Sequence, residues 1–264
     1  MFMKLETYPI YLVSLDQDSA KRKLLEKRFP RYFPEMKRVT AVDGRKLSAK
    51  EFFDFIAKPM VHGHRLMLPG EVGCSLSHIH ALESFLSLGT EAALILEDDV
   101  IGDDKSIESV FELIPVLPPE SLMICGGQEG LPARKYIFGK NAGIKGLYRL
   151  APYSNNYIFR TCCYVVTPVS ARQILGRHRQ ALELADAWGT FFRRTTTHIY
   201  YANKLGHPRG LSASHLEQDR SRFSHKSALG CARISARIKH RVSRIRRKLG
   251  ALICFVQGYR RVVE

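Results

Sequence analysis

The chain of 264 residues lacks the features of membrane-spanning, secreted and disulfide-bonded proteins. No apolar run approaches the roughly 20 residues that a helix needs to cross a bilayer. Residues 1–9 have neither the basic region nor the apolar core of a secretory signal. The six cysteines show no Cys-x-x-Cys spacing, and the adjacent pair Cys162 and Cys163 is poorly placed for a disulfide. With 45% hydrophobic residues, the sequence predicts a cytoplasmic globular protein with free thiols.

Two common phosphate-binding motifs are also missing. No Gly-x-Gly-x-x-Gly follows the first predicted strand, and there is no Gly-Lys-Ser/Thr loop. The sequence therefore predicts neither a Rossmann dinucleotide site nor a P-loop. If a nucleotide binds, a metal ion rather than a glycine-rich cradle has to neutralise its phosphates.

The net charge of +16 is concentrated near the C-terminus. Residues 220–250 hold eleven Lys or Arg and no Asp or Glu, so the rest of the chain carries only +5. Apolar residues recur there at steps of three or four, which predicts a basic amphipathic helix: Ile234, Ile238, Val242, Ile245, Leu249 and Ile253. We expect residues 223–264 to form a tail that binds an anionic membrane surface or, alternatively, packs on the main domain of residues 1–222. Nucleic acid is a weaker alternative, because only Phe223 offers an aromatic ring for stacking on bases.

Strand-like and helix-like segments alternate through the first half of the chain. The patterns predict strands at 9–15, 36–42, 92–97, 121–125 and 161–167, and helices at 20–29, 70–88, 106–117 and 168–179. Such alternation favours an α/β fold with an open, mostly parallel sheet flanked by helices. Ligands of such sheets bind beyond the carboxyl ends of the strands.

The most informative stretch is an apolar strand that ends in three carboxylates, Glu97, Asp98 and Asp99. Strand alternation would place Glu97 and Asp99 on one face, where they are candidate ligands of Mg²⁺ or Mn²⁺. An acidic turn facing water is the alternative. His207 or His215 would be a further metal ligand, although each is equally explained as a loop residue.

Polar residues follow the two earlier strands at the same predicted edge of the sheet. Ser14 and Asp16 end the first strand, and the turn Asp43-Gly44 ends the second. Hydroxyl and carboxylate groups there suit the uridine and ribose of a nucleotide, and Arg22 suits a phosphate. Helix caps and turns are the alternative explanation for each of them.

The start of the helix predicted at 70–88 carries another group of polar side chains. Cys74, Ser77 and His78 share a helix face, and Glu71 precedes them by one turn. We expect Ser77 and His78 to contact a bound donor. A capping role for Glu71 and a packed His78 are the alternative.

Four successive blocks, at residues 10–16, 41–44, 70–78 and 95–100, resemble those of glycosyltransferase family 25, the lipooligosaccharide-biosynthesis family of Gram-negative bacteria. Residues 163–171 and 185–188 resemble its later blocks less closely. The resemblance implies a GT-A type fold, a UDP-sugar donor, a divalent metal and inversion at the anomeric carbon.

An inverting displacement needs a carboxylate base opposite the leaving UDP. Asp186 is the first candidate, because it matches the family's later acidic block and precedes Trp188, whose ring would stack on a sugar; Glu71 is the second. With Glu97 and Asp99 on the metal, Asp98 is left to the donor.

The resulting hypothesis is an inverting hexosyltransferase on the cytoplasmic face of the inner membrane. It would move galactose or glucose from UDP-galactose or UDP-glucose to a sugar hydroxyl of lipooligosaccharide core, forming a β-linkage. A UDP-sugar-binding or hydrolysing protein without transfer activity is one alternative. The other is a basic nucleic-acid-binding protein, but we expect no nucleic acid partner.

Overall fold

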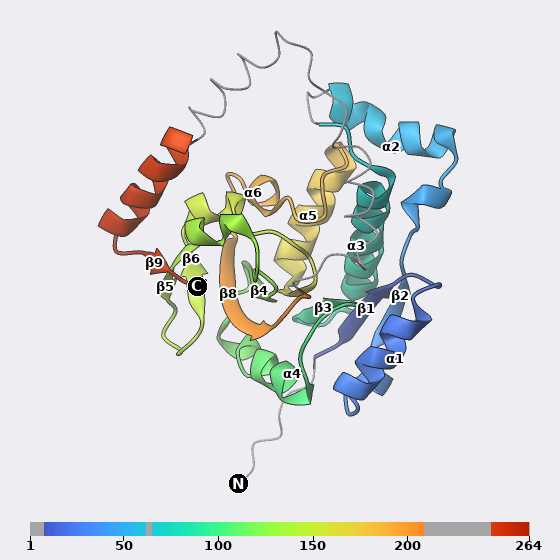
Figure 1. Cartoon of the computed structure of the whole chain (residues 1–264), viewed down its shortest axis with the longest axis horizontal. Coiled ribbons are helices and arrows are strands. Elements are labelled where there is room, and N and C mark those ends of the chain that lie inside the picture. The colour runs from blue at the N-terminus through green and yellow to red at the C-terminus, as the bar shows by residue number, and fades with distance from the viewer. Residues whose placement is uncertain (1–7, 62–64, 209–243, 264) are drawn as a thin grey trace.

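The computed structural model describes residues 8–61, 65–208 and 244–263, and within them one nine-stranded sheet forms the centre of the molecule (Figure 1). The strand order is β2-β1-β3-β7-β4-β8-β6-β5-β9. The strands are β1 Ile10–Ser14, β2 Lys37–Thr40, β3 Ala93–Glu97, β4 Ser121–Gly126, β5 Phe138–Asn141, β6 Tyr148–Leu150, β7 Cys163–Val166, β8 His198–Leu205 and β9 Arg260–Arg261.

The sheet is mixed. β1 pairs in parallel with β2 and β3, and β4 pairs in parallel with β8. β7 lies antiparallel between β3 and β4, and the β6, β5 and β9 edge is antiparallel throughout. As a result β1, β2, β3, β4, β5 and β8 run in one direction, and β6, β7 and β9 run against them. The predicted α/β fold with an open sheet flanked by helices is confirmed.

Helices cover both faces of the sheet (Figure 1). They are α1 Ser19–Arg28, α2 Ala49–Val61, α3 Pro69–Leu88, α4 Asp104–Phe111, α5 Pro168–Gln180, α6 Trp188–Phe191 and an unlabelled helix over 244–256. Short 3-10 turns lie at η1 Phe33–Glu35, η2 Gly44–Lys46, η3 Ile114–Val116, η4 Pro132–Tyr136 and η5 Pro152–Asn156.

Alternate side chains of the strands pack into two separate hydrophobic cores, one on each face of the sheet. Leu12 of β1 packs with α1 and α4 on one face, whereas its neighbours Tyr11 and Val13 pack with α3, α5 and α6 on the other. Strands buried on both faces need continuous apolar sequence, which explains why β1 and β3 lack a clear polar alternation.

Several elements differ from the sequence-based expectations. The predicted strands and helices up to residue 179 all occur with ends shifted by a few residues, except that the helix predicted at 106–117 ends at Phe111 and is followed by η3. Sequence analysis did not identify α2, the β5–β6 hairpin or β8. The hairpin strands have only four and three residues, too short to establish a period of two.

The C-terminal segment both packs on the sheet and exposes apolar surface. Cys254 of the 244–256 helix is buried against Phe138 and Ala151, and Tyr153 donates a hydrogen bond to the carbonyl of Arg247 at 2.8 Å. β9 adds to the sheet edge beside β5. The exposed apolar side chains of this helix are Ile245, Leu249, Leu252, Ile253, Phe255 and Val256.

Only residues 244–263 of the predicted tail are among the described residues. The predicted apolar stripe between 234 and 242 lies outside the described residues, as does His215. Within the described ranges, no helix is long and apolar enough to span a membrane.

Candidate active site

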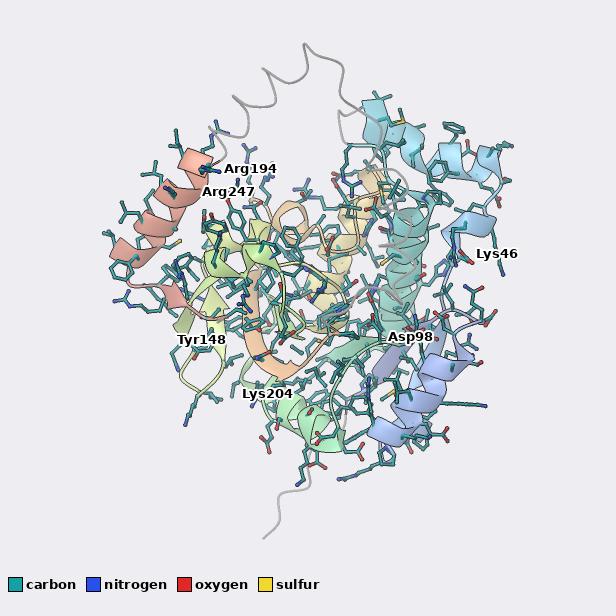
Figure 2. The ribbon with its side chains drawn as sticks, in the orientation of Figure 1. Lys46, Asp98, Tyr148, Arg194, Lys204 and Arg247 are labelled. Carbon is teal, nitrogen blue, oxygen red and sulfur yellow. The ribbon has the colours of Figure 1, made fainter. Side chains whose placement is uncertain are left out.

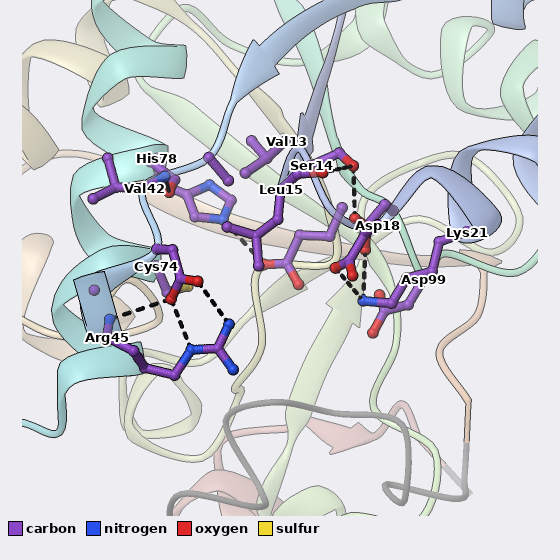
Figure 3. Close-up of a pocket in the computed structure, with 17 residues that line it drawn as sticks. Val13, Ser14, Leu15, Asp18, Lys21, Val42, Arg45, Cys74, His78 and Asp99 are labelled. Carbon is purple, nitrogen blue, oxygen red and sulfur yellow. Dashed lines mark hydrogen bonds and ion pairs between the residues drawn. The ribbon is translucent and has the colours of Figure 1, made fainter.

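A pocket opens where β1 and β3 end, beside the loop after β2 and the first turns of α3 (Figure 3). Because these three strands are parallel neighbours, their carboxyl ends meet at one edge of the sheet. The lining includes eight residues singled out from the sequence: Ser14, Asp43, Gly44, Ser77, His78, Glu97, Asp98 and Asp99. The structure therefore brings these eight residues together at one pocket.

The three carboxylates do not share a strand face. β3 ends at Glu97, and the amide of Val100 donates to the carbonyl of Glu97 at 3.2 Å, which closes a turn over Asp98 and Asp99. The expectation that Glu97 and Asp99 project together fails because strand alternation ends at this turn. Each carboxylate instead faces different partners.

Asp98 is buried and ties β3 to β1 and α1. Ser14 Oγ donates to one of its oxygens at 2.7 Å, and Lys21 Nζ contacts the other at 3.1 Å. Burial raises the pKa of Asp98, although Lys21 and Ser14 oppose the rise. Figure 2 shows Asp98 beside α1, on the far side of the molecule from Arg247. Lys21 also contacts Asp18 at 2.9 Å. It lines the pocket as a cation that sequence analysis did not identify.

Glu97 is held by hydrogen bonds from α3 and from the segment before β7. Its Oε1 lies 3.0 Å from Nε2 of His78 and also accepts from Thr161 Oγ1. Burial alone would raise the pKa of Glu97, but these bonds and the charge of His78 lower it. Nδ1 of His78 in turn lies 3.0 Å from the hydroxyl of Tyr164.

Asp99 faces His207, which follows β8. The two are joined by a 3.1 Å contact between Asp99 Oδ2 and His207 Nε2. Nδ1 of His207 lies 2.8 Å from the carbonyl of Pro208, which fixes the ring with Nε2 toward the acid. Burial would lower the pKa of His207, but the hydrogen bond and charge of Asp99 raise it overall. Asp99 Oδ1 is buried without a hydrogen-bond partner among the described residues.

That orphaned oxygen fits a divalent cation. One carboxylate with an unused buried oxygen beside an oriented imidazole supplies the oxygen and nitrogen ligands that Mn²⁺ accepts, and Mg²⁺ would use the carboxylate alone. His207 lies more than a hundred residues after Asp99 in the sequence. Only the fold brings it to Asp99.

The loop after β2 adds a second cation to the pocket. Asp43 is bound by Arg45 through two contacts of 2.7 and 2.9 Å, and these bonds lower the pKa of Asp43. Arg45 lines the pocket and was also missed from the sequence. Ser77 Oγ accepts from the amide of Val42 at 2.8 Å, so it holds this loop rather than only facing a ligand.

Two glycines let this loop touch α3. A Cβ on Gly73 would lie 2.4 Å from the carbonyl oxygen of Val42 and 2.5 Å from the amide of Gly44. A Cβ on Gly44 would lie 1.8 Å from the carbonyl oxygen of Pro69. Glycine is therefore needed at both positions for close backbone approach.

Asp16 and Arg22 do not line the pocket. Asp16 is exposed and pairs with Arg38, while Arg22 donates to Ser14 Oγ at 2.9 Å and to the Asp16 carbonyl at 3.0 Å. Arg22 thus fixes the end of β1. Of the two, Arg22 contacts a pocket residue directly, through Ser14.

Glu71 and Asp186, the two candidate bases, lie near a second pocket lined by Arg65 and Arg193. Arg65 forms two bonds of 2.7 and 2.9 Å with the buried carboxylate of Glu71, which also caps α3 by accepting from the amide of Leu68 at 3.0 Å. The bond to Glu71, with smaller effects of the Glu71 and Asp186 charges, raises the pKa of Arg65 despite desolvation. The two acids therefore share one cation.

Asp186 also supports a strained residue. Its Oδ2 accepts from the backbone amide of Arg160, which has a φ of 69°, in the left-handed region that non-glycine residues rarely adopt. Trp188 donates to the carbonyl of Arg160 at 3.3 Å and is only 1% exposed. The expectation that Trp188 stacks on a sugar is therefore wrong, because its ring is packed against Tyr164 and Phe191 in the core.

The family match covers the N-terminal part of the chain. Residues 7–116 match the model of a family described as glycosyltransferase family 25 (LPS biosynthesis protein). A glycosyltransferase 25 family member from Anopheles gambiae is 32% identical over 103 residues, which are 37% of this chain and 17% of that protein. A member from Drosophila melanogaster is 29% identical over 102 residues, with the same two shares.

Among solved structures, the crystal structure of mannose-1-phosphate geranyltransferase from Thermus thermophilus aligns with 75% of both chains at a TM-score of 0.41 and 10% identity. The curated relatives are much longer than the region they share with this chain. The resemblance seen in the sequence is nevertheless confirmed by the family match, which contains β1, α3 and the acidic turn. Residues 7–116 are therefore similar to glycosyltransferase family 25.

Proposed function

We propose that this protein is a metal-assisted, inverting glycosyltransferase that transfers galactose or glucose from a UDP-sugar to a hydroxyl of lipooligosaccharide core, forming a β-linkage. The family of residues 7–116 supports a transferase, and its description names LPS biosynthesis. The observation that carries the proposal is Asp99, which lines a pocket at the carboxyl edge of the sheet beside His207 and has one buried oxygen that no described residue hydrogen-bonds.

The donor would lie along this edge. Lys21 and Arg45 supply positive charge for a diphosphate, and each is already oriented by a carboxylate. Ser14 and Asp43 offer polar groups to the uridine and ribose. Because Asp18, Asp43, Glu97, Asp98 and Asp99 line the same pocket, an anionic nucleotide would also need a bound divalent cation there.

Mn²⁺ or Mg²⁺ would be held by Asp99, with His207 as a nitrogen ligand for Mn²⁺. Glu97, the other carboxylate expected on this metal, is directed to His78 instead. When bound, the metal ion offsets the charge that develops on the departing diphosphate. Asp98 keeps the turn in place through Ser14 and Lys21. The three acids therefore divide their work between metal binding and positioning.

Asp186 is our choice for the catalytic base, and Glu71 is the second. The base would take the proton of the acceptor hydroxyl as its oxygen bonds to the anomeric carbon, while the bond from that carbon to the UDP oxygen breaks. Glu71 is buried and bound to Arg65 and to the start of α3, which disfavours it as a proton acceptor. Asp186 is less buried and lies beside the second pocket, where an acceptor sugar would fit.

The 244–256 helix supports binding of the protein to an anionic inner-membrane surface, on the cytoplasmic face. Leu249 and Phe255 are 55% and 57% exposed, and Arg244 and Arg246 to Lys248 lie on the same helix. Exposed apolar side chains flanked by basic ones suit the headgroup region of acidic lipids. A lipid-linked acceptor would be found there.

A transfer assay tests the proposal. The protein would be incubated with several UDP-sugars and a panel of acceptor sugars, with and without Mn²⁺, and the products read by mass. We expect transfer that needs metal and falls at least about 100-fold in Asp99→Ala, whereas Asp54→Ala on the exposed face of α2 stays active.

Two outcomes would favour the alternatives. Release of sugar to water with every acceptor would indicate a UDP-sugar hydrolase or binding protein. Steeply salt-dependent binding of DNA or RNA with no use for Mn²⁺ would indicate a nucleic-acid-binding protein. Full turnover of Asp99→Ala in chelator-treated protein would refute the metal assignment.

A further inference from the structure

A second cluster of ligand atoms lies in the same pocket, between α3 and the end of β3. Sγ of Cys74, a ring nitrogen of His78 and a carboxylate oxygen of Glu97 all lie within 4.8 Å of one another. We propose that these three side chains form a binding site for a thiophilic divalent cation, Zn²⁺ above all, distinct from the Asp99 and His207 pair.

The backbone brings the three ligands together without strain in the fold. Cys74 and His78 are four residues apart on α3, so they lie on one helix face. Glu97 is the last residue of β3, and its Oε1 already lies 3.0 Å from His78 Nε2. Zinc bonds of about 2.0 to 2.3 Å separate tetrahedral ligands by roughly 3 to 4 Å, so small side-chain rotations close the site.

Surrounding groups orient two of the ligands. The hydroxyl of Tyr164 lies 3.0 Å from His78 Nδ1, and Thr161 Oγ1 donates to Glu97. Tyr164 is 1% exposed and packs against Trp188, so it is rigid. Zinc-binding histidines commonly have such a partner on the second ring nitrogen, which fixes the tautomer.

The chemistry of the ligands separates this site from the one at Asp99. A thiolate with an imidazole and one carboxylate favours Zn²⁺ over Mg²⁺, which takes oxygen ligands. Cys74 is half-buried, belongs to no disulfide and lines the pocket together with His78 and Glu97. The cation therefore has an entry path through the pocket.

Binding of the divalent cation releases one proton from the protein. The Cys74 thiol loses its proton to solvent as the sulfur–metal bond forms. His78 binds through Nε2 with its remaining proton on Nδ1, directed at the Tyr164 oxygen. Glu97 exchanges its hydrogen bond from His78 for the metal.

Cobalt titration of the full chain tests the site, because a thiolate bound to Co²⁺ gives a near-ultraviolet charge-transfer band whether or not the protein is an active transferase. We expect one equivalent of Co²⁺ to produce this band, Zn²⁺ to displace it, and about one proton to be released per metal. Cys74→Ser should abolish the band. Cys254→Ser, in the 244–256 helix, should keep it.

Two further variants secure the interpretation. Glu97→Gln should weaken Co²⁺ binding at least about tenfold, and Asp99→Ala should leave the thiolate band in place. Circular dichroism would establish that each variant is folded. Absence of the band from the wild-type protein, or its persistence in folded Cys74→Ser, would overturn the proposal.

Discussion

Replacing Gly73 by alanine tests whether the contact between α3 and the loop after β2 builds the pocket. The added Cβ would lie 2.4 and 2.5 Å from two backbone atoms, about 1 Å closer than an ordinary contact. Relieving such overlap costs about 1 to 3 kcal/mol, against the roughly 1 kcal/mol that alanine gains over glycine in a helix. Because both neighbours are backbone, the relief has to come from a shift of α3 against Gly44.

Gly176 of α5 provides a matched control. A Cβ there meets no atom within 4 Å, so Gly176→Ala gains the helix propensity without the clash. We expect the two variants to differ by about 2 kcal/mol in free energy of unfolding. For a chain of this size, that is a difference of about 4 to 8 °C in Tm.

Thermal unfolding and donor binding would be measured together. The shift of α3 moves Cys74, Ser77 and His78 relative to the acidic turn, so we expect Gly73→Ala to weaken UDP binding about tenfold, by calorimetry, while Gly176→Ala leaves it unchanged. Equal Tm values and equal UDP affinities for the two variants would refute the role assigned to this contact.

Three other outcomes are expected. Burial, with a smaller effect of His78, lowers the pKa of His178 to about 4. As the pH falls below about 6.5, this histidine is protonated in the unfolded chain but stays neutral in the folded one, so the folded state loses stability. This residue should remove about 2 kcal/mol of stability between pH 7.5 and 5; urea unfolding at both values should show a smaller loss in His178→Gln, and an identical loss would contradict the assignment. Asp186→Asn should lower kcat at least about 100-fold with little change in KM for the donor, and an unchanged kcat would remove Asp186 as the base. Replacing both Leu249 and Phe255 by serine should reduce flotation with phosphatidylglycerol vesicles at least about tenfold, whereas Val61→Ser on α2 should not; equal flotation would exclude the helix as the membrane contact.

The sequence by itself determined the elements around the pocket and their chemistry. Continuous apolar runs define β1 and β3 because both faces of these strands are buried, and polar residues at their ends mark the carboxyl edge. Parallel pairing of neighbouring strands then brings Ser14, Asp43 and the acidic turn together. These are local signals combined with one general rule of α/β sheets.

Tertiary structure decided which groups meet across large distances in sequence. His207 lies more than a hundred residues from Asp99, and only the crossing of β8 beyond β4 brings it there. The turn after β3 directs Glu97 toward His78 and Asp99 toward His207, although strand alternation alone would have placed both side chains on the same face. Trp188 likewise is buried in the core, because the burial of a side chain depends on tertiary packing, which a local sequence pattern does not specify.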